Sequence, residues 1–439
     1  MCSVTSRIVT VCLLIAGFAM PGRAQQSAAT ASTGGDTLQF VLFLSRHGVR
    51  SPTGKAAQYN PYSAAPWPEW SVPPGYLTAH GYTLMTQFGA YDRARLAAEG
   101  LLAPAGCVDA AWVTIAADSD QRTRETGKAI AQGMFPGCVV EVQARAEGTA
   151  DPLFHSQHAG VGSMNRALAR AAVAGRIGGD PGNLTEAYRP QLAALDRILA
   201  GCGAGADAEP KRTSLFAVPA SDPVASGERG GTLRGPLTVA STLSENLLLE
   251  YTEGMQGKDL AWGCMDEAAL RHVLQLHSAA SDFMRRTPAI ARAEASNLLA
   301  HMLLSLEQGA TEKPVEGALG KAGDRVLFLA GHDTNIETVA ATLGLTWIID
   351  GRRDDTPPGG ALVFELWRSA KGTLTVRVFY MAQTLGQMRA AQPLTSDHPP
   401  ALAPIFVPGC SREDMSCTLE GFVATVNRSI DAGFVSKLQ

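Results

Sequence analysis

The sequence has no strong excess of charge of either sign. Its 439 residues include 37 lysines and arginines against 41 aspartates and glutamates, which gives a formal net charge of −4. A chain with this balance has no overall attraction for nucleic acid or for an anionic membrane surface. Any affinity for an anion must therefore come from a local cluster of basic side chains.

Long apolar runs are missing from most of the chain. The longest, residues 8–20, follows Arg7 and precedes the small-x-small sequence Gly22–Ala24. This run is short for a membrane span, and the three features together are typical of a secretory signal peptide. We expect residues 1–24 to be a signal peptide, residues 25–36 a polar leader, and the mature protein to be periplasmic or secreted. An uncleaved membrane anchor is the alternative.

Cysteine is scarce, and its count fits an exported protein. The chain has 8 cysteines, and Cys2 and Cys12 lie in the expected signal peptide. The even number that is left indicates disulfides formed in an oxidising compartment. Cys410 and Cys417 are separated by a short loop, which favours this pair first. Spacing leaves the connectivity of the other four cysteines open. In order of preference, the pairs are Cys410–Cys417, Cys107–Cys138 and Cys202–Cys264.

Motifs of several other enzyme classes are absent. The chain contains no GxxxxGK[ST] phosphate loop, no HExxH zinc motif and no GxSxG nucleophile motif. His155 and His158 have the spacing of half a metal site, but no cluster of carboxylates or thiolates accompanies them in the sequence. We therefore expect no metal there.

Short apolar runs at residues 39–45, 111–117 and 325–330 predict buried strands, and each is followed at once by a polar cluster. The clusters are RHGVR, DSDQRTR and GHDTN, and helical periodicity follows each of them. This arrangement is expected of an α/β sheet whose strand C-termini meet at one crevice. After Gly360, the alternating runs ALVFELW and LTVRVFYMA predict an antiparallel hairpin that returns to the sheet.

The chain is long for a single core, and its pattern changes in the middle. Residues 163–288 show the i, i+3, i+4 apolar spacing of helices and little strand signal. We predict an α/β fold with a central mixed, mostly parallel sheet flanked by helices. Residues 37–162 and 289–439 form this α/β domain, and residues 163–288 form a mainly α-helical inserted domain.

The first polar cluster predicts an anion site. Arg46, His47 and Arg50 follow a buried strand, and guanidinium groups match phosphate oxygens with planar, bidentate donors. Two neighbouring arginines disfavour a proton on His47, so the imidazole should be neutral and nucleophilic. The structural alternative is an arginine pair bridged to buried carboxylates beside a packed histidine. Arg122 and the pair His332-Asp333, at the ends of the other strands, favour the anion site.

RHGxRxP at residues 46–52 with a distant HD at residues 332–333 resembles the histidine acid phosphatases, the branch of the histidine phosphatase superfamily that contains secreted phytases. The likeness covers nearly the whole chain from about residue 37. Segments similar to the enteric bacterial phytases and glucose-1-phosphatases occur in the same order, among them WPEWSVPPGYLTAHG, DSDQRTRETG, STLSENLLL, RRTP, GHDTN and QTLGQMR.

The resemblance implies a mechanism that the residue chemistry supports. His47 is the expected nucleophile that forms a phosphohistidine, and Asp333 is the expected proton donor. The groups expected to hold the phosphoryl oxygens are Arg46, Arg50, Arg122 and His332. Because guanidinium groups supply the positive charge, no metal or other cofactor is expected. A carboxylic acid must be protonated to donate, so activity should favour acid pH.

The residues around the expected pocket favour a phytase. HDTN and RHGVR are similar to the phytase versions of the two motifs, and the resemblance implies substrate contacts from Thr53, Lys55, Glu245 and Arg286. Gly54 intervenes between Thr53 and Lys55, where the enteric pattern has lysine directly after threonine. Glu245 as a solvated helix residue and Arg286 as a surface charge are the structural alternatives.

We expect a secreted acid phosphomonoesterase that hydrolyses phytate, myo-inositol hexakisphosphate. A glucose-1-phosphatase or a broad-specificity periplasmic acid phosphatase is the alternative among enzymes. An inactive periplasmic phosphate-ester binding protein is the alternative from another class, although His47 and Asp333 are both present. The expected partner is a small phosphate monoester, with no nucleic acid, no membrane after signal cleavage, and a monomeric state.

Overall fold

The computed structural model describes residues 35–202, 212–224 and 232–437. The predicted signal peptide, residues 1–24, and almost all of the predicted leader lie outside the described residues. Within the described ranges, no helix combines the length and the apolar character that crossing a membrane requires.

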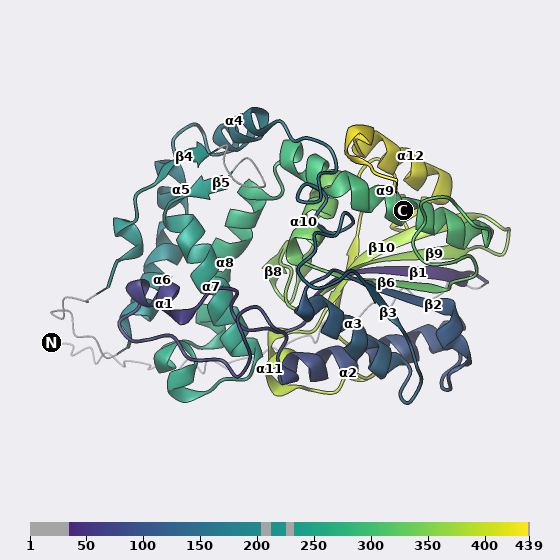
Figure 1. Ribbon diagram of the computed structural model, residues 1–439, viewed down its shortest axis with the longest axis horizontal. Coiled ribbons are helices and arrows are strands. Elements are labelled where there is room, and N and C mark those ends of the chain that lie inside the picture. The colour runs from purple at the N-terminus through teal and green to yellow at the C-terminus, as the bar shows by residue number, and fades with distance from the viewer. Residues whose placement is uncertain (1–34, 203–211, 225–231, 438–439) are drawn as a thin grey trace, which may run out of the picture. The chain divides into compact units, whose positions relative to one another are not determined.

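A mixed sheet of eight strands carries the site (Figure 1), in the order β11-β10-β9-β1-β6-β2-β3 with β12 paired to β10. The pairs β1–β6, β6–β2 and β2–β3 are parallel, and the remaining pairs are antiparallel. The strands are β1 (Thr37–Arg46), β2 (Val113–Ala117), β3 (Val142–Ala144), β6 (Val326–Gly331), β9 (Ala361–Arg368), β10 (Leu374–Ala382), β11 (Ala401–Ile405) and β12 (Ser416–Thr418).

The predicted strands are β1, β2 and β6, and the predicted hairpin is β9–β10. The prediction of a mixed sheet flanked by helices is confirmed, but the sheet is not mostly parallel. Three strand pairs are parallel, all in the half that contains β1, β6, β2 and β3, and four are antiparallel. Along β1 the apolar side chains alternate between two hydrophobic cores. Phe40, Leu42 and Leu44 lie in one core, and Val41 and Phe43 lie in the other.

Helices cover both faces of the sheet (Figure 1). One face packs against α2 (Ala79–Ala98) and α3 (Gln121–Met134). The other face packs against three helices, α9 (Pro288–Thr311), α10 (Asp333–Leu343) and α12 (Leu419–Ser429). Because both faces are buried, the parallel strands β1, β2 and β6 have continuous apolar runs rather than an alternation of apolar and polar residues.

Residues 163–288 form a predominantly helical segment with its own hydrophobic cluster. The cluster also includes Val49 and Leu84, so the helical segment packs on the part of the chain that holds β1 and α2. The helices are α4 (Arg166–Arg176), α5 (Gly182–Ala187), α6 (Arg189–Ala200), α7 (Pro236–Thr252) and α8 (Glu267–Met284). A short antiparallel pair, β4 (Ser221–Val224) and β5 (Thr232–Arg234), lies within this segment, whose sequence shows little strand signal.

The remaining elements are short. They are α1 (Ala56–Tyr59), α11 (Leu385–Ala390), β7 (Ile348–Ile349), β8 (Arg352–Arg353) and the 3₁₀ helices Asn60–Tyr62, Val108–Trp112, Leu215–Ala217, Gly257–Asp259, Ala261–Gly263 and Ala432–Phe434. Disulfides join Cys107 to Cys138, Cys202 to Cys264 and Cys410 to Cys417. These are the pairs that we preferred from the sequence, so that prediction is confirmed.

The parallel register brings the functional clusters to one edge. In the pairing of β1 with β6, Arg46 lies opposite Gly331, and in the pairing of β2 with β6, Ala117 lies opposite Ala330. The residues that follow these three strands, His47, Asp118 and His332, therefore leave the sheet at the same edge. Parallel α/β sheets form their ligand crevice at this edge.

Candidate active site

His47 lies at the centre of this edge and is buried. Its Nδ1 lies 2.9 Å from the carbonyl oxygen of Gly48, which can only accept a hydrogen bond. Nδ1 therefore carries the hydrogen, and Nε2 keeps its lone pair. Burial, followed by the charges of Arg122, Arg50 and Arg46, lowers the pKa of His47 well below its ordinary value. The imidazole is thus neutral and able to act as a nucleophile.

Gly48 allows the chain to pass close to helix α2. A Cβ at this position would lie 2.8 Å from Cγ of Met85 and 3.1 Å from the Gly81 carbonyl oxygen. The Gly48 amide also donates to the hydroxyl of Thr126 on α3 at 3.0 Å. The turn after β1 is therefore fixed against both helices on that face, which in turn fixes the orientation of His47.

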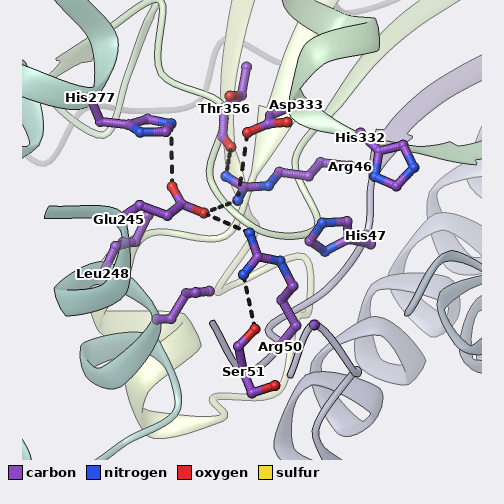
Figure 2. A network of polar contacts seen from close by, with 12 residues as sticks. Arg46, His47, Arg50, Ser51, Glu245, Leu248, His277, His332, Asp333 and Thr356 are labelled. Atoms are coloured by element: carbon purple, nitrogen blue, oxygen red, sulfur yellow. Dashed lines mark hydrogen bonds and ion pairs between the residues drawn. The ribbon is translucent and has the colours of Figure 1, made fainter. Parts of the chain in front are cut away.

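Arg46 and Arg50 share one carboxylate (Figure 2). Glu245, on α7, accepts from Nη2 of Arg46 and lies 3.5 Å from Nη2 of Arg50. The second oxygen of Glu245 lies 3.3 Å from Nε2 of His277, on α8. Burial raises the pKa of Glu245, but Arg46, His277 and Arg50 outweigh burial and lower it below its ordinary value. Glu245 is therefore an anion that orients both arginines.

The alternative of a solvated Glu245 is wrong, because the residue is buried in the site. We expected Glu245 to contact the substrate directly. In the structure its oxygens contact Arg46, Arg50 and His277. The main-chain oxygen of Thr356 also accepts from Nη1 of Arg46 at 2.6 Å. Both Nη atoms of Arg46 are thus held in place before any substrate binds.

Arg122 and His332 form the other side of the site. Nη2 of Arg122 lies 3.5 Å from Nδ1 of His332, and Nε2 of His332 lies 2.6 Å from Oδ2 of Asp118. The same oxygen lies 2.9 Å from Nε2 of His155. Burial opposes the charge on Asp118, but its hydrogen bonds with His155 and His332 lower the pKa of the carboxyl strongly. Asp118 therefore fixes the His332 ring. Burial, aided by the charge of Arg122, lowers the pKa of His332 below its ordinary value, and the hydrogen bond with Asp118 only partly offsets this.

Asp333 is the first residue of α10, directly after the strand edge. Its Oδ2 lies 3.1 Å from Nη1 of Arg285 and 4.0 Å from Nη2 of Arg46. Burial raises the pKa of this carboxyl, but Arg285, followed by Arg46, holds it well below its usual range. The N-terminus of α10 also favours a negative charge at this position. Asp333 is therefore ionised in the substrate-free protein.

A group of four side chains, Asp118, Asp120, His155 and His332, has ligand atoms that all lie within 4.8 Å of one another. Asp118 already accepts from both imidazoles, and Oδ2 of Asp120 lies 2.5 Å from Nη2 of Arg122. The atoms that could bind a metal ion therefore already make the contacts that orient His332 and Arg122. We had paired His155 with His158 as half a metal site, but the structure brings His155 to Asp118 instead.

The structure brings together the expected catalytic residues Arg46, His47, Arg50, Arg122, His332 and Asp333. Thr53 and Lys55 are exposed on the loop that follows Arg50. Lys55 lines a cavity of about 350 Å³ beside Tyr59 and Trp67. A Cβ on Gly54 would lie 2.2 Å from the hydroxyl of Tyr59, so a larger residue there would displace that side chain.

Arg286 is not brought to the cluster. Its Nη2 donates to the carbonyl of Leu345 at 2.6 Å, and its guanidinium lies 5.8 Å from the centre of the Trp347 ring. Among the contacts of the described residues, none joins it to the catalytic groups. Its neighbour Arg285 contacts Asp333 instead, since consecutive side chains near a helix end point about 100° apart.

Sequence reasoning missed Asp118, His277 and Arg285 as parts of the site. Asp118 had a usable signal, because it directly follows a predicted strand beside the other two clusters. His277 lies within a helical pattern that gives no sign of a site, and the resemblance pointed to Arg286 rather than to Arg285. Nothing in the local pattern of α8 shows which of its residues faces a strand edge that is distant in the sequence.

Comparison with known proteins agrees with this geometry. The model of the histidine phosphatase superfamily (branch 2) matches residues 37–381. The chain belongs to this superfamily. Phytase AppA of Escherichia coli K12 is 35% identical over 401 residues, which are 89% of this chain and 92% of that protein. A glucose-1-phosphatase of Salmonella typhimurium is 28% identical over 432 residues, or 94% and 97% of the two chains.

Solved structures show the same fold in this superfamily. Hafnia alvei phytase in complex with tartrate matches with a TM-score of 0.82 and 35% identity, over 92% of this chain and 99% of that one. The same phytase in complex with myo-inositol hexakis sulphate matches with a TM-score of 0.83 and 34% identity over the same shares. The resemblance inferred from the motifs is confirmed.

Proposed function

We propose that this protein is a phytase, an exported acid phosphatase that hydrolyses phytate through a phosphohistidine on His47. The observation that carries the proposal is a neutral, buried imidazole with a free Nε2 lone pair among three arginines, with a carboxyl group at Asp333 beside it. A nucleophile, cationic groups for the phosphoryl oxygens and a proton donor are what phosphomonoester hydrolysis requires.

In the first step, Nε2 of His47 attacks phosphorus and the bond from phosphorus to the ester oxygen breaks. Arg46, Arg50, Arg122 and His332 hold the phosphoryl oxygens and stabilise the charge of the transition state. Asp333, protonated, gives its proton to the leaving alkoxide. The alcohol departs, and His47 carries the phosphoryl group.

In the second step, water attacks the phosphorus of the phosphohistidine. The ionised Asp333 takes a proton from this water, the bond from nitrogen to phosphorus breaks, and inorganic phosphate is released. His47 returns to its neutral state with its Nδ1 hydrogen on the Gly48 carbonyl. No step uses a metal, so activity should persist in excess chelator.

Substrate binding supplies the protonated state of Asp333. In the free protein, Arg285 and Arg46 keep this carboxyl ionised. A phosphate that accepts hydrogen bonds from Arg46 brings negative charge next to Asp333, which raises the pKa of the carboxyl. The complex therefore takes up a proton more readily than the free protein does, and acid pH favours this uptake.

The choice of phytate rests on the phytase versions of both motifs and on the phytases among the relatives. The shape of the loop after Arg50, with exposed Thr53 and Lys55, is compatible with contacts to further phosphate groups on a large substrate. Export is supported by the pattern of residues 1–24 and by the three disulfides. N-terminal sequencing of the mature protein tests the cleavage near Ala24.

The deciding experiment compares kcat/KM for phytate, glucose 1-phosphate and p-nitrophenyl phosphate at acid pH. We expect phytate to exceed glucose 1-phosphate by at least tenfold. A preference for glucose 1-phosphate would replace the proposal with a sugar phosphatase, and binding without turnover of any ester would indicate a binding protein.

His47→Ala is the matched inactive variant. It should abolish turnover of all three esters while circular dichroism shows an intact fold. Alkaline quench of the wild-type protein during turnover of ³²P-labelled p-nitrophenyl phosphate should trap label on the chain, because a phosphohistidine is stable in base, and His47→Ala should trap none. Turnover retained by the variant would remove His47 as the nucleophile.

A further inference from the structure

Arg285 follows helix α8 directly and places its guanidinium between two carboxylates of helix α10. Its Nη1 lies 3.1 Å from Oδ2 of Asp333 and donates to Oε2 of Glu337 at 2.8 Å. The side chains of Arg285 and Glu337 are 17% and 2% exposed, so solvent screens this contact little. Asp333 and Glu337 are four residues apart, or about one helical turn, which lets one cation bridge both.

Glu337 is held in a defined position. Its Oε1 lies 3.4 Å from the hydroxyl oxygen of Thr356, and the main-chain oxygen of Thr356 accepts from Nη1 of Arg46 at 2.6 Å. Glu337 therefore contacts the same loop that orients the phosphate-binding Arg46. This arrangement fixes how Arg285 divides its positive charge between Glu337 and Asp333.

We propose that Arg285 and Glu337 are a pair of positioning residues that sets how readily Asp333 gains and releases its proton during catalysis. Neither residue needs to touch the substrate for this role. The inference rests on the proposed function in one respect, namely that Asp333 is the proton donor. It adds two residues to the mechanism: Arg285 favours the ionised form of Asp333, and Glu337 favours the protonated form.

Several charged or titratable groups face Asp333, and the role of Arg285 is distinct among them. These groups are Arg46, His47, Arg50, Arg122, Glu245, His277, Arg285 and Glu337. Of the two arginines in contact with Asp333, Arg285 is the nearer, at 3.1 Å against 4.0 Å for Arg46. A bound phosphate takes up the charge of Arg46, whereas Arg285 stays between Glu337 and Asp333. Arg285 therefore acts on Asp333 throughout the cycle.

The two residues have opposite charges, so their removal should shift the proton affinity of Asp333 in opposite directions. Arg285→Gln removes a cation that opposes protonation of Asp333. Glu337→Gln removes an anion that favours protonation and leaves Arg285 to Asp333 alone. A residue with only a structural role would not produce shifts of opposite sign.

The experiment measures kcat/KM against pH for wild type, Arg285→Gln and Glu337→Gln, with an alkyl phosphate such as glycerol 1-phosphate as the substrate. An alkoxide is a poor leaving group, so turnover falls as Asp333 loses its proton at rising pH. We expect this basic limb to move up by about one pH unit in Arg285→Gln and down in Glu337→Gln. With p-nitrophenyl phosphate, whose leaving group needs little protonation, both shifts should be much smaller.

Two controls separate charge from folding. Arg285→Lys keeps the cation and should return the basic limb toward that of wild type. Arg271→Gln removes a cation from the same helix, where it pairs with Glu267 and Asp350, and should leave the limb in place. Thermal unfolding and circular dichroism check that each variant is folded.

A carboxyl NMR titration of ¹³C-labelled aspartate reads Asp333 without turnover, so the inference can be tested even if phytate is not the substrate. Limbs that stay in place in both variants, or that move in the same direction, would overturn the proposal. A KM raised for both esters alike, with a fixed limb, would instead make Arg285 a phosphate ligand. If the wild-type protein does not hydrolyse phytate, that result contradicts only the proposed function.

Discussion

At the scale of single residues, each central carboxylate of the site contacts a specific base. Glu245 binds Arg46 and Arg50, Asp118 contacts His332 and His155, and Asp333 contacts Arg285. The carboxylates offset the repulsion between the cationic groups and hold them in fixed positions before substrate arrives. Preorganised charge of this kind stabilises a transition state without reorganisation during the reaction.

Asp333→Asn should separate substrates by their leaving groups. The amide cannot donate a proton as an acid does, so kcat/KM for phytate should fall by at least about a hundredfold. For p-nitrophenyl phosphate the loss should be much smaller, since p-nitrophenolate leaves without a proton. Steady-state kinetics on both esters at one pH make the comparison. Equal losses for the two substrates would argue against Asp333 as the proton donor.

Glu245→Gln should destabilise the protein and make it more dependent on anions. Removing one partner of a buried ion pair typically costs about 3–5 kcal/mol, because the remaining charges are left unpaired. Here Arg46 and Arg50 would face each other without a carboxylate. We expect a lower Tm, and a larger gain in Tm on adding inorganic phosphate than in wild type.

Glu267→Gln is the matched control for this prediction. Glu267 pairs with Arg271, but its side chain is 39% exposed. Exposed pairs contribute about 0–1 kcal/mol, so the Tm should change little and the response to phosphate should match that of wild type. If phosphate raised the Tm of Glu245→Gln and of wild type by the same amount, Glu245 would not be what offsets the repulsion between Arg46 and Arg50.

At the scale of elements, the start of α10 determines where the histidine and the acid lie. The main-chain amide of His332 donates to Oδ1 of Asn335 at 2.9 Å, and Nδ2 of Asn335 donates to the Phe154 carbonyl at 2.8 Å. Asn335 thus closes the first turn of the helix and fixes this turn to a neighbouring loop. His332 leaves the strand edge and Asp333 begins the helix in fixed positions.

Asn335→Ala should loosen this turn. Loss of a helix-capping side chain costs about 1 kcal/mol, and the displaced His332 and Asp333 should lower kcat more than they raise KM. Steady-state kinetics and thermal unfolding measure the two effects. The control is Thr342→Ala, because the Thr342 hydroxyl donates to the Thr338 carbonyl in the last turns of the same helix. A similar loss of kcat in both variants would contradict a specific role for Asn335.

At the scale of the whole molecule, the site combines residues of the sheet edge with residues of the helical segment. Glu245 lies on α7, and His277 and Arg285 come from α8 and its end, whereas His47 follows β1. We propose that residues 163–288 are an inserted domain whose contribution is to orient groups of the sheet edge. In this proposal, the α/β domain, residues 37–162 and 289–439, supplies the nucleophile and the acid. The monomeric state and the lack of nucleic-acid binding remain predictions.

The contribution of His47 to stability should fall as the pH falls below about 6.5, the ordinary pKa of histidine. The folded pKa of His47 lies below its unfolded value, so the unfolded chain binds a proton there that the folded chain does not. Stability from this group is thus full at higher pH and is lost by up to about 1.4 kcal/mol per pH unit as the pH falls. Asp333 adds a loss of the same sign below about pH 3.9.

His47→Gln tests this pH dependence, because glutamine does not titrate. Denaturant unfolding at pH 7 and pH 5 should give a smaller difference in free energy for the variant than for wild type. An equal difference in both proteins would show that His47 does not bind an extra proton on unfolding.

The sequence by itself determined the strands β1, β2 and β6, the hairpin β9–β10 and the family. These features depend on contiguous patterns: an apolar run, a turn between alternating strands, or a motif such as RHGVRSP within a few residues. Because the C-terminal ends of parallel strands share one edge, the position of His47 near Arg122, His332 and Asp333 followed from those strands as well.

Only the tertiary structure decided which residues from the helical segment complete the site. Arg285 and Arg286 are adjacent and chemically identical, yet one contacts Asp333 and the other contacts Leu345 and Trp347. Glu245 likewise follows no local rule, since its partners Arg46 and Arg50 lie about two hundred residues earlier in the sequence. The direction of a side chain at a helix end, and the contacts between distant segments, depend on how α7 and α8 pack against the sheet edge. Local sequence patterns contain no record of that packing.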